Sequence, residues 1–68
     1  MVAFEVQDMS CSHCVGAITR AIKSVDEDAR VEIDLPRRRV RIVPGRADAA
    51  TLARAIEEAG YTPVAVSA

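Results

Sequence analysis

Two cysteines three positions apart are the side chains of this sequence best suited to chemistry. Cys11 and Cys14 lie in the polar stretch MSCSHC, residues 9–14, and the chain of 68 residues contains no other cysteine. The thiolate is the form of cysteine that attacks other sulfurs and binds metals. Inside cells, where thiols stay reduced, such a pair acts as metal ligands or as a redox dithiol rather than as a structural disulfide.

The number of available ligands narrows the choice of metal. A closed Zn(II) site uses four cysteine or histidine ligands, whereas this chain has two cysteines and one histidine, His13. Two thiolates alone suit soft Cu(I) better than Zn(II) or harder ions. We therefore expect Cys11 and Cys14 to hold one Cu(I), with Ag(I), Hg(II) and Zn(II) as candidate substitutes. A two-sulfur site also leaves space for a third sulfur, so the ion could pass to another protein by ligand exchange.

Size and composition exclude several other functions. The length predicts one domain, residues 1–68, with room for a surface site but hardly for a deep catalytic cleft. The formal net charge is −1, and the only aromatic residues are Phe4 and Tyr61, which argues against nucleic-acid binding. No segment approaches the roughly 20 apolar residues that span a bilayer. Because the N-terminus also lacks a signal-peptide pattern, we expect a cytoplasmic protein without direct membrane insertion.

Hydrophobic periodicity predicts six structural elements. Apolar and polar residues alternate over 2–6, 31–35, 40–42 and 64–66, as in strands. Apolar residues recur at helical spacing from Cys14, and a second helix is expected between Asp48 as its cap and Gly60 as its end. The stripe of the first helix consists of Val15, Ile18, Ile22 and Val25. The order β-α-β-β-α-β predicts an α+β, ferredoxin-like sandwich: a four-stranded antiparallel sheet with both helices on one face.

The expected path of the chain brings three loops to one end of the molecule: residues 8–13, the arginine-rich hairpin and the turn at Gly60. In that hairpin, a pairing of Leu35 with Val40 would place Asp34 opposite Arg41. The acidic run 26–28, at the end of the first helix, is expected to be a solvated turn. The chemistry is therefore expected at the end that carries the cysteines.

The two cysteines straddle the predicted start of the first helix. Cys11 is expected in the loop and Cys14 in the first helical turn, beside backbone N–H groups that have no partner within the helix. The positive end of the helix dipole favours thiolate over thiol. Such a position suits a bound anion or a metal held by thiolates.

This arrangement resembles the heavy-metal-associated domain. The features that carry the resemblance are Met-x-Cys-x-x-Cys at the junction of a first strand and helix, a β-α-β-β-α-β order, and Gly60-Tyr61 after the second helix. Free-standing bacterial members of that family are cytosolic copper chaperones that deliver Cu(I) to P-type copper ATPases. The resemblance therefore implies a carrier rather than an enzyme, whose partner is a metal-binding domain of such an ATPase.

The resemblance also implies roles for the residues around the cysteines. Met9 is expected to be buried and to shape the loop, and Tyr61 to pack beside it. Ser12 and His13 resemble the corresponding pair in bacterial chaperones, some of which use the histidine when copper bridges two molecules. A monomer is thus expected without metal, and copper could bridge a homodimer. Asp8 departs from the glycine that is common in the family.

Three other functions are consistent with the same residues. The chain could be the N-terminal metal-binding domain of a heavy-metal ATPase. It could carry Hg(II) or another soft metal, although such carriers usually have a signal peptide. A dithiol oxidoreductase is the alternative from another class, but redox Cys-x-x-Cys motifs usually belong to longer, thioredoxin-like chains.

Overall fold

The computed structural model describes residues 1–67, in which six elements follow the predicted order. Each strand and helix coincides with one of the periodic segments of the sequence. The elements are β1 (Val2–Val6), α1 (Ser12–Val25), β2 (Arg30–Asp34), β3 (Arg39–Val43), α2 (Ala49–Glu58) and β4 (Pro63–Val66).

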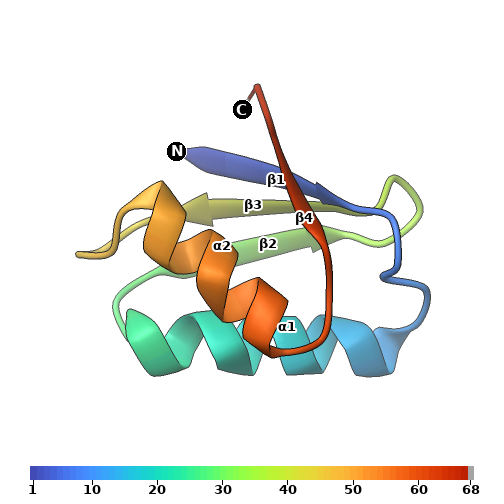
Figure 1. Ribbon diagram of the computed structural model, residues 1–68, viewed down its shortest axis with the longest axis horizontal. Helices are drawn as coiled ribbons and strands as arrows, with labels where there is room; N and C mark the ends of the chain where they lie inside the picture. The colour runs from blue at the N-terminus through green and yellow to red at the C-terminus, as the bar shows by residue number, and fades with distance from the viewer. Residues whose placement is uncertain (68) are drawn as a thin grey trace.

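The four strands form one antiparallel sheet in the order β2-β3-β1-β4. Both helices lie against one face of this sheet, and the other face is left open (Figure 1). The sequence prediction of a ferredoxin-like sandwich is thus confirmed. Ala3 pairs with Val66 at one end of the β1–β4 ladder, and Val6 pairs with Pro63 at the other. The beginning of β1 and the end of β4 are therefore neighbours, and the loop that follows β1 lies at the other end of this ladder (Figure 1).

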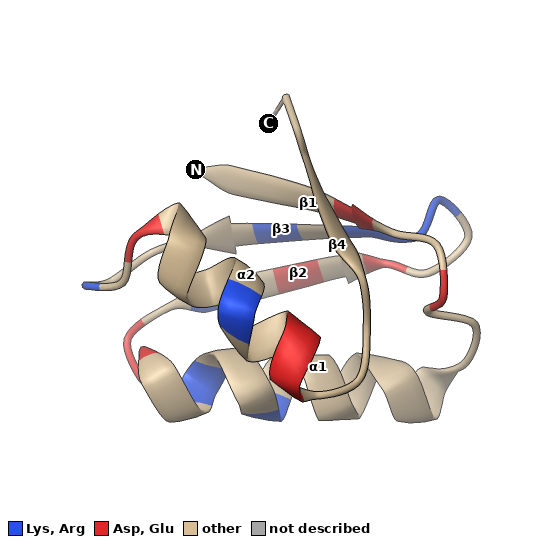
Figure 2. Cartoon of the chain, viewed as in Figure 1, with Lys and Arg blue, Asp and Glu red and all other residues tan. Residues whose placement is uncertain are grey.

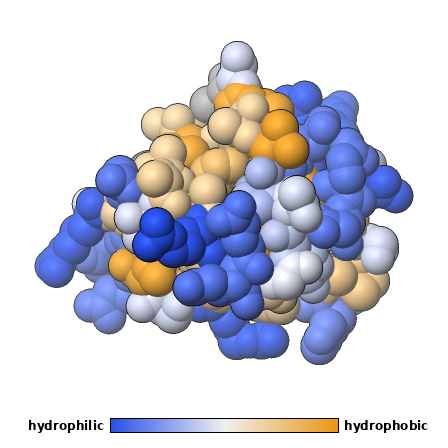
Figure 3. Space-filling view, viewed as in Figure 1, coloured by the Kyte–Doolittle hydropathy of each residue, from blue (hydrophilic) through white to orange (hydrophobic). Residues whose placement is uncertain are grey.

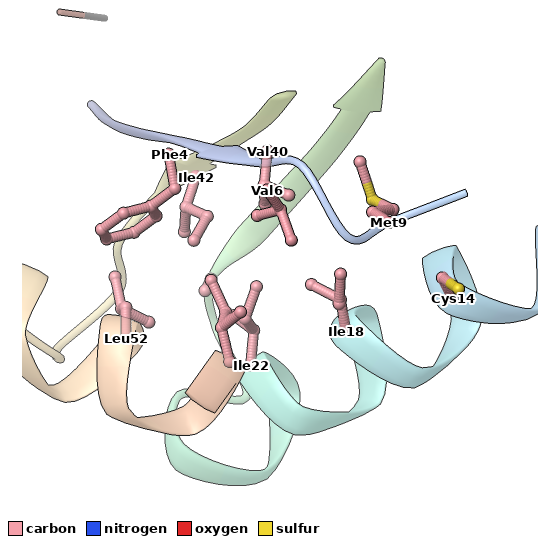
Figure 4. Packing of buried hydrophobic residues seen from close by; sticks show 11 residues of the cluster. Phe4, Val6, Met9, Cys14, Ile18, Ile22, Val40, Ile42 and Leu52 are labelled. Atoms are coloured by element: carbon pink, nitrogen blue, oxygen red, sulfur yellow. The ribbon is translucent and has the colours of Figure 1, made fainter. Parts of the chain in front are cut away.

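The hydrophobic core lies between the sheet and the helices. Phe4 and Val6 of β1 and Val40 and Ile42 of β3 face it, which is the alternation expected of half-buried strands. Figure 4 shows these side chains pointing toward the helices. The other members of the cluster are Met9, Cys14, Ile18, Ile22, Ala29, Leu52 and Ile56. Cys14 therefore occupies the place at the start of the α1 stripe, next to the core rather than apart from it.

The stripe predicted for the first helix is wrong at its last residue. Val25 is 43 % exposed, because Ala29 and Asp26 occupy the core side at this end of α1. The outer strand β4 also differs from a simple alternation. Val64 pairs with Glu5 on the face turned away from the helices, and its side chain is 53 % exposed. Apolar side chains gather around β4 on the surface drawn in Figure 3.

The β2–β3 hairpin has a different register from the one predicted. Ile33, not Leu35, lies opposite Val40, and Glu32, not Asp34, lies opposite Arg41. Strand β2 ends one residue earlier than predicted because Leu35 belongs to the turn, where its carbonyl accepts a hydrogen bond from the Arg38 N–H at 3.1 Å. The turn is closed by Arg38 in the left-handed region, with φ of 56°.

The acidic run after α1 is not a solvated turn at its first residue. Asp26 is 4 % exposed, and one carboxylate oxygen, Oδ2, accepts the backbone N–H groups of Gly45, Arg46 and Ala47 at 2.8 to 2.9 Å. These hydrogen bonds, led by those of Arg46 and Ala47, hold the pKa of Asp26 below its usual value. The carboxylate therefore ties the end of α1 to the loop before α2.

Helix α2 begins and ends as the sequence predicts. The Asp48 carboxylate caps it by accepting the Thr51 N–H at 2.8 Å. At the other end Gly60 has φ of 100°, which a residue without Cβ adopts readily. The Gly60 N–H donates to the Glu57 carbonyl and the Tyr61 N–H to the Ile56 carbonyl, the two hydrogen bonds of a Schellman motif. Neither helix within residues 1–67 combines the length and the hydropathy of a membrane span.

Candidate metal site

The loop that carries the cysteines is anchored in the core by Met9. Strand β1 ends in a tight turn, in which the Met9 N–H donates to the Val6 carbonyl at 3.1 Å. The Met9 side chain is fully buried. Figure 4 shows it at the same end of the core cluster as Cys14. Met9 is thus buried, as expected, at the end of the core that lies next to Cys14.

The two cysteines lie on either side of the start of α1. Cys11 is the N-terminal capping residue, with an extended backbone, and Cys14 is the third residue of the helix. Their Sγ atoms are 3.5 Å apart, within hydrogen-bond distance for sulfur. Cys11 is exposed, whereas Cys14 is 8 % exposed. The pair is thus neither splayed apart nor sealed in the interior: one sulfur faces solvent and the other lies at the edge of the core.

Hydrogen bonds around Cys14 favour its anion. The largest effect comes from the Tyr61 side chain, followed by the Ser10 backbone and the Cys11 side chain, and together they lower the pKa of Cys14 to about 7. Partial burial opposes this effect without cancelling it. At neutral pH a large share of Cys14 is therefore thiolate, the form that binds soft metals. The backbone groups involved belong to the loop and to the capping residue, not to the first turn of the helix.

Tyr61 lies between the core and the cysteine pair. It is half-buried and packs against the core cluster. The hydrogen bond with Cys14, burial and the negative charges nearby together raise the pKa of Tyr61. The hydroxyl therefore stays protonated at neutral pH and remains a donor toward sulfur. This hydrogen bond puts Tyr61 beside Cys14, on the side of the site that faces the core.

Ser12 and His13 lie on the solvent side of the helix start. Both are exposed, so neither is packed against the cysteine that faces the core. Within residues 1–67, no group of three or more histidine, cysteine, aspartate or glutamate side chains could hold a metal ion together. Two thiolates suit a soft ion of low coordination number better than a closed zinc site, which takes four ligands.

Charged side chains avoid the site itself. No lysine, arginine, aspartate or glutamate occurs between Met9 and Thr19, and the first turns of α1 are free of charge in Figure 2. The nearest carboxylate in sequence is that of Asp8. Without carboxylates in the first helical turn, hard cations find no oxygen ligands there, and thiolates meet no like charge from within the turn.

The family of this chain is shown by its similarity to known protein families. The profile of the heavy-metal-associated domain matches residues 3–62, which include the cysteine loop and all of α1 and α2. The chain belongs to the heavy-metal-associated domain family. The resemblance inferred from the motif at residues 9–14 is thereby confirmed.

Three solved structures are similar to this heavy-metal-associated domain over nearly their full lengths. A single-residue mutant of the copper chaperone Atx1 from Synechocystis PCC6803 has 30 % identity and a TM-score of 0.88, with coverage of 94 % of this chain and 100 % of that one. The protein Atu1203 of Agrobacterium tumefaciens has 43 % identity and a TM-score of 0.79, with coverage of 88 % and 92 %. A structure described as a gold binding protein has 27 % identity and a TM-score of 0.89, with coverage of 97 % and 100 %.

The sequence did not indicate every residue that shapes the site. The contact of Asp8 with Thr62, where the Asp8 carboxylate accepts the Thr62 backbone N–H at 3.2 Å, joins residues 54 positions apart. The guanidinium of Arg38 likewise reaches the Gln7 side chain at 3.3 Å. Both contacts confirm that the three predicted loops meet at one end of the molecule. Only the departure from glycine at Asp8 could have drawn attention to that residue beforehand.

Proposed function

We propose that this protein is a copper chaperone that binds one Cu(I) between Cys11 and Cys14 and passes it to a metal-binding domain of a P-type copper ATPase. The observation that carries the proposal is the pair of sulfurs 3.5 Å apart, one exposed and one at the edge of the core. The family membership and the 30 % identity to a copper chaperone support it. In this role the protein acts as a carrier of the ion rather than as an enzyme.

Unequal exposure of the two sulfurs suits delivery. With the zinc–thiolate bond of about 2.3 Å as a guide, a metal ion in line between two thiolates needs the sulfurs about 4.6 Å apart. Binding therefore widens the pair, and Cys11, in the exposed loop, is the residue free to move. A sulfur from an acceptor can then reach the ion from the Cys11 side while Cys14 still holds it. The ion changes partners by successive exchange of ligands and is never free in solution.

Anaerobic titration with Cu(I) against a competing chelator tests the binding step. We expect one tight equivalent in the wild type and its loss in both Cys11→Ser and Cys14→Ser. His13→Ala is the matched control, because it alters an exposed neighbour while both sulfurs remain. Retention of the tight equivalent in either cysteine variant would contradict the proposed ligand pair.

Stopped-flow mixing of the Cu(I)-loaded protein with a metal-free acceptor domain tests the delivery step. Direct exchange predicts a transfer rate that rises with acceptor concentration and exceeds the rate of spontaneous Cu(I) loss. A transfer rate equal to the dissociation rate at every acceptor concentration would exclude direct exchange. The reducing cytoplasm is the compartment in which we expect this transfer, because both thiols must stay reduced.

Other soft metals are the main rival cargo. The similarity to a gold binding protein at 27 % identity is consistent with a site that selects softness rather than copper alone. Competition of Cu(I) against Ag(I), Hg(II) and Zn(II) at fixed protein concentration measures this preference. We expect Zn(II) to compete weakly, since the chain supplies two ligands where a closed zinc site takes four.

A further inference from the structure

Asp8 connects two segments that are distant in sequence but adjacent at the cysteine end. It lies in the turn between β1 and the cysteine loop, and its Oδ1 atom accepts the backbone N–H of Thr62 at 3.2 Å. Thr62 directly follows Tyr61, in the connection between α2 and β4. A hydrogen bond between these segments therefore joins the loop that presents the cysteines to the turn that presents the tyrosine.

Tyr61 is consequently held on both sides along the backbone. Its own N–H donates to the Ile56 carbonyl in the Schellman motif at the end of α2. The N–H of the next residue, Thr62, donates to Asp8. The first hydrogen bond fixes the turn to its helix, whereas the second is the one that fixes it to the cysteine loop. Removal of the Asp8 acceptor leaves the turn and the neighbouring Val6–Pro63 pair intact but removes this hydrogen bond between the turn and the cysteine loop.

We propose that Asp8 is a positioning residue, which holds Tyr61 against Cys14 by accepting the Thr62 N–H and thereby slows release of the bound ion. The part that concerns the ion rests on the proposed function. The part that concerns Tyr61 does not, because it is a statement about the metal-free protein. Asp8 itself is exposed and needs no contact with the metal to act in this way.

The test compares three variants with the wild type. Asp8→Ala removes the acceptor, and Asp8→Asn keeps an acceptor oxygen at the same place while it removes the charge. Asp34→Ala is the matched control: its carboxylate also accepts a backbone N–H on an exposed loop at the same end, that of Arg37 at 3.3 Å. The control thus removes the same charge and the same kind of hydrogen bond, together with an exposed ion pair to Arg37 at 3.5 Å, away from Tyr61.

Two readouts are taken on the metal-free proteins and one on the loaded proteins. The Thr62 amide proton is followed by NMR, and Tyr61 by its fluorescence lifetime, since it is the only tyrosine and the chain has no tryptophan. Loss of Cu(I) to an excess of bathocuproine disulfonate gives the release rate. In Asp8→Ala we expect amide exchange of Thr62 and release of Cu(I) to become about three- to tenfold faster, as loss of one hydrogen bond implies. The lifetime of Tyr61 should change as well.

Asp8→Asn and Asp34→Ala should both resemble the wild type in all three readouts. An unchanged Thr62 amide and Tyr61 lifetime in Asp8→Ala would overturn the proposal, as would an Asp8→Asn variant that behaves like Asp8→Ala. An unchanged Cu(I) release rate in Asp8→Ala would also overturn it. If the wild type fails to bind Cu(I), the proposed function is wrong, and the two metal-free readouts still decide whether Asp8 holds Tyr61.

Discussion

The two helices of this protein begin in contrasting ways. At the start of α2, the Asp48 carboxylate accepts the Thr51 N–H at 2.8 Å, so a side chain satisfies the free end of the helix. At the start of α1, the capping residue is Cys11, and its side chain makes no capping hydrogen bond. The Cys11 sulfur contacts the Cys14 sulfur instead. Helix α2 therefore begins with a stabilising cap, whereas the capping position of α1 holds a side chain that is free to bind a ligand.

The two ends of α1 also differ in how they enclose a negative charge. At the far end, Asp26, a buried anion, receives three backbone N–H groups from the loop before α2. At the cysteine end, the backbone of Ser10 and the side chain of Tyr61 favour an anion at Cys14. Both ends of the helix thus gather donors around a negative charge. One charge is permanently enclosed by the fold, and the other lies where an ion and a partner can reach its neighbour Cys11.

Loss of the buried Asp26 carboxylate should have the largest effect on the melting temperature. Asp26→Ala leaves three backbone N–H groups without their acceptor, and we expect the melting temperature to fall by about 15 °C. Asp28→Ala is the control, since its exposed carboxylate makes only a long ion pair with Arg46, at 3.8 Å. If the two ends are independent, the pH dependence of Cys14 alkylation should be the same in Asp26→Ala as in the wild type. A shifted alkylation profile would show that the ends are coupled.

The Asp26 carboxylate also determines how the stability of the folded protein depends on pH. The pKa of Asp26 is lowered in the folded state, chiefly by the Arg46 and Ala47 backbone N–H groups. Its stabilisation is therefore complete above the ordinary aspartate pKa, near 4, and is lost as the pH falls below that value. Thermal melts of the wild type and Asp26→Asn should differ most near pH 6 and converge toward pH 2. A difference that grows toward acid would have the wrong sign.

Gly45 and Gly16 should respond in opposite directions to the same added methyl group. A Cβ on Gly45 would come within 2.5 Å of the Asp28 Cβ and 2.7 Å of an Asp26 carboxylate oxygen. Gly45→Ala should therefore lower the melting temperature by about 10 °C. A Cβ on Gly16, within α1, meets only the end of the Arg20 side chain at 3.4 Å. Gly16→Ala should raise the melting temperature by about 5 °C, from helix propensity. Equal destabilisation by both would refute the close packing inferred at the enclosed end.

The contrast between the two helix starts can be tested by adding a capping side chain to α1 and removing the one of α2. Cys11→Ser supplies α1 with a hydroxyl cap and should raise the melting temperature by about 5 °C. Asp48→Ala removes the cap of α2 and should lower it by a similar amount. The stabilised variant is the one that should no longer bind Cu(I). If Cys11→Ser melts at a lower temperature than the wild type, the start of α1 is not short of a cap.

The smallest effect is expected from Tyr61→Phe. Alkylation of Cys14 by iodoacetamide in the wild type should increase with pH around a midpoint of about 7, because the thiolate is the reactive form. Loss of the Tyr61 hydroxyl removes the largest cause of the lowered pKa, so the midpoint should rise by less than about one pH unit. Mass spectrometry after timed quenching separates Cys14 from Cys11. An unchanged midpoint would mean that the loop backbone and the Cys11 side chain favour the anion without Tyr61.

The sequence was sufficient for the fold and for the neighbours of the candidate site. Alternation in β1, the capping residue Asp48 and Gly60 after α2 are local features, so they predict elements whose ends depend on adjacent residues. The position of the cysteines at a strand–helix junction follows from the same local patterns. The directions in which the predicted strands and helices run then bring three loops to one end of the molecule.

The sequence was not sufficient where distant segments decide the outcome. An acidic run at a helix end has the same appearance whether or not a loop twenty residues away donates to it, so the burial of Asp26 could not be foreseen. The hairpin register depended on whether Leu35 joins the strand or the turn, and Arg38 in the left-handed region carries no sequence mark comparable to glycine. The contacts of Asp8 with Thr62 and of Tyr61 with Cys14 likewise exist only once the sheet has brought these segments together.

The adjacency of the first and last strands has a practical consequence. Ala3 and Val66 are paired at one pole of the molecule, and the cysteine loop occupies the opposite pole, beyond the pair of Val6 and Pro63. The first and last described residues therefore lie on the side of the β1–β4 ladder away from the cysteine loop. The domain can therefore be immobilised on a surface or joined in tandem while its cysteine end remains accessible to another molecule.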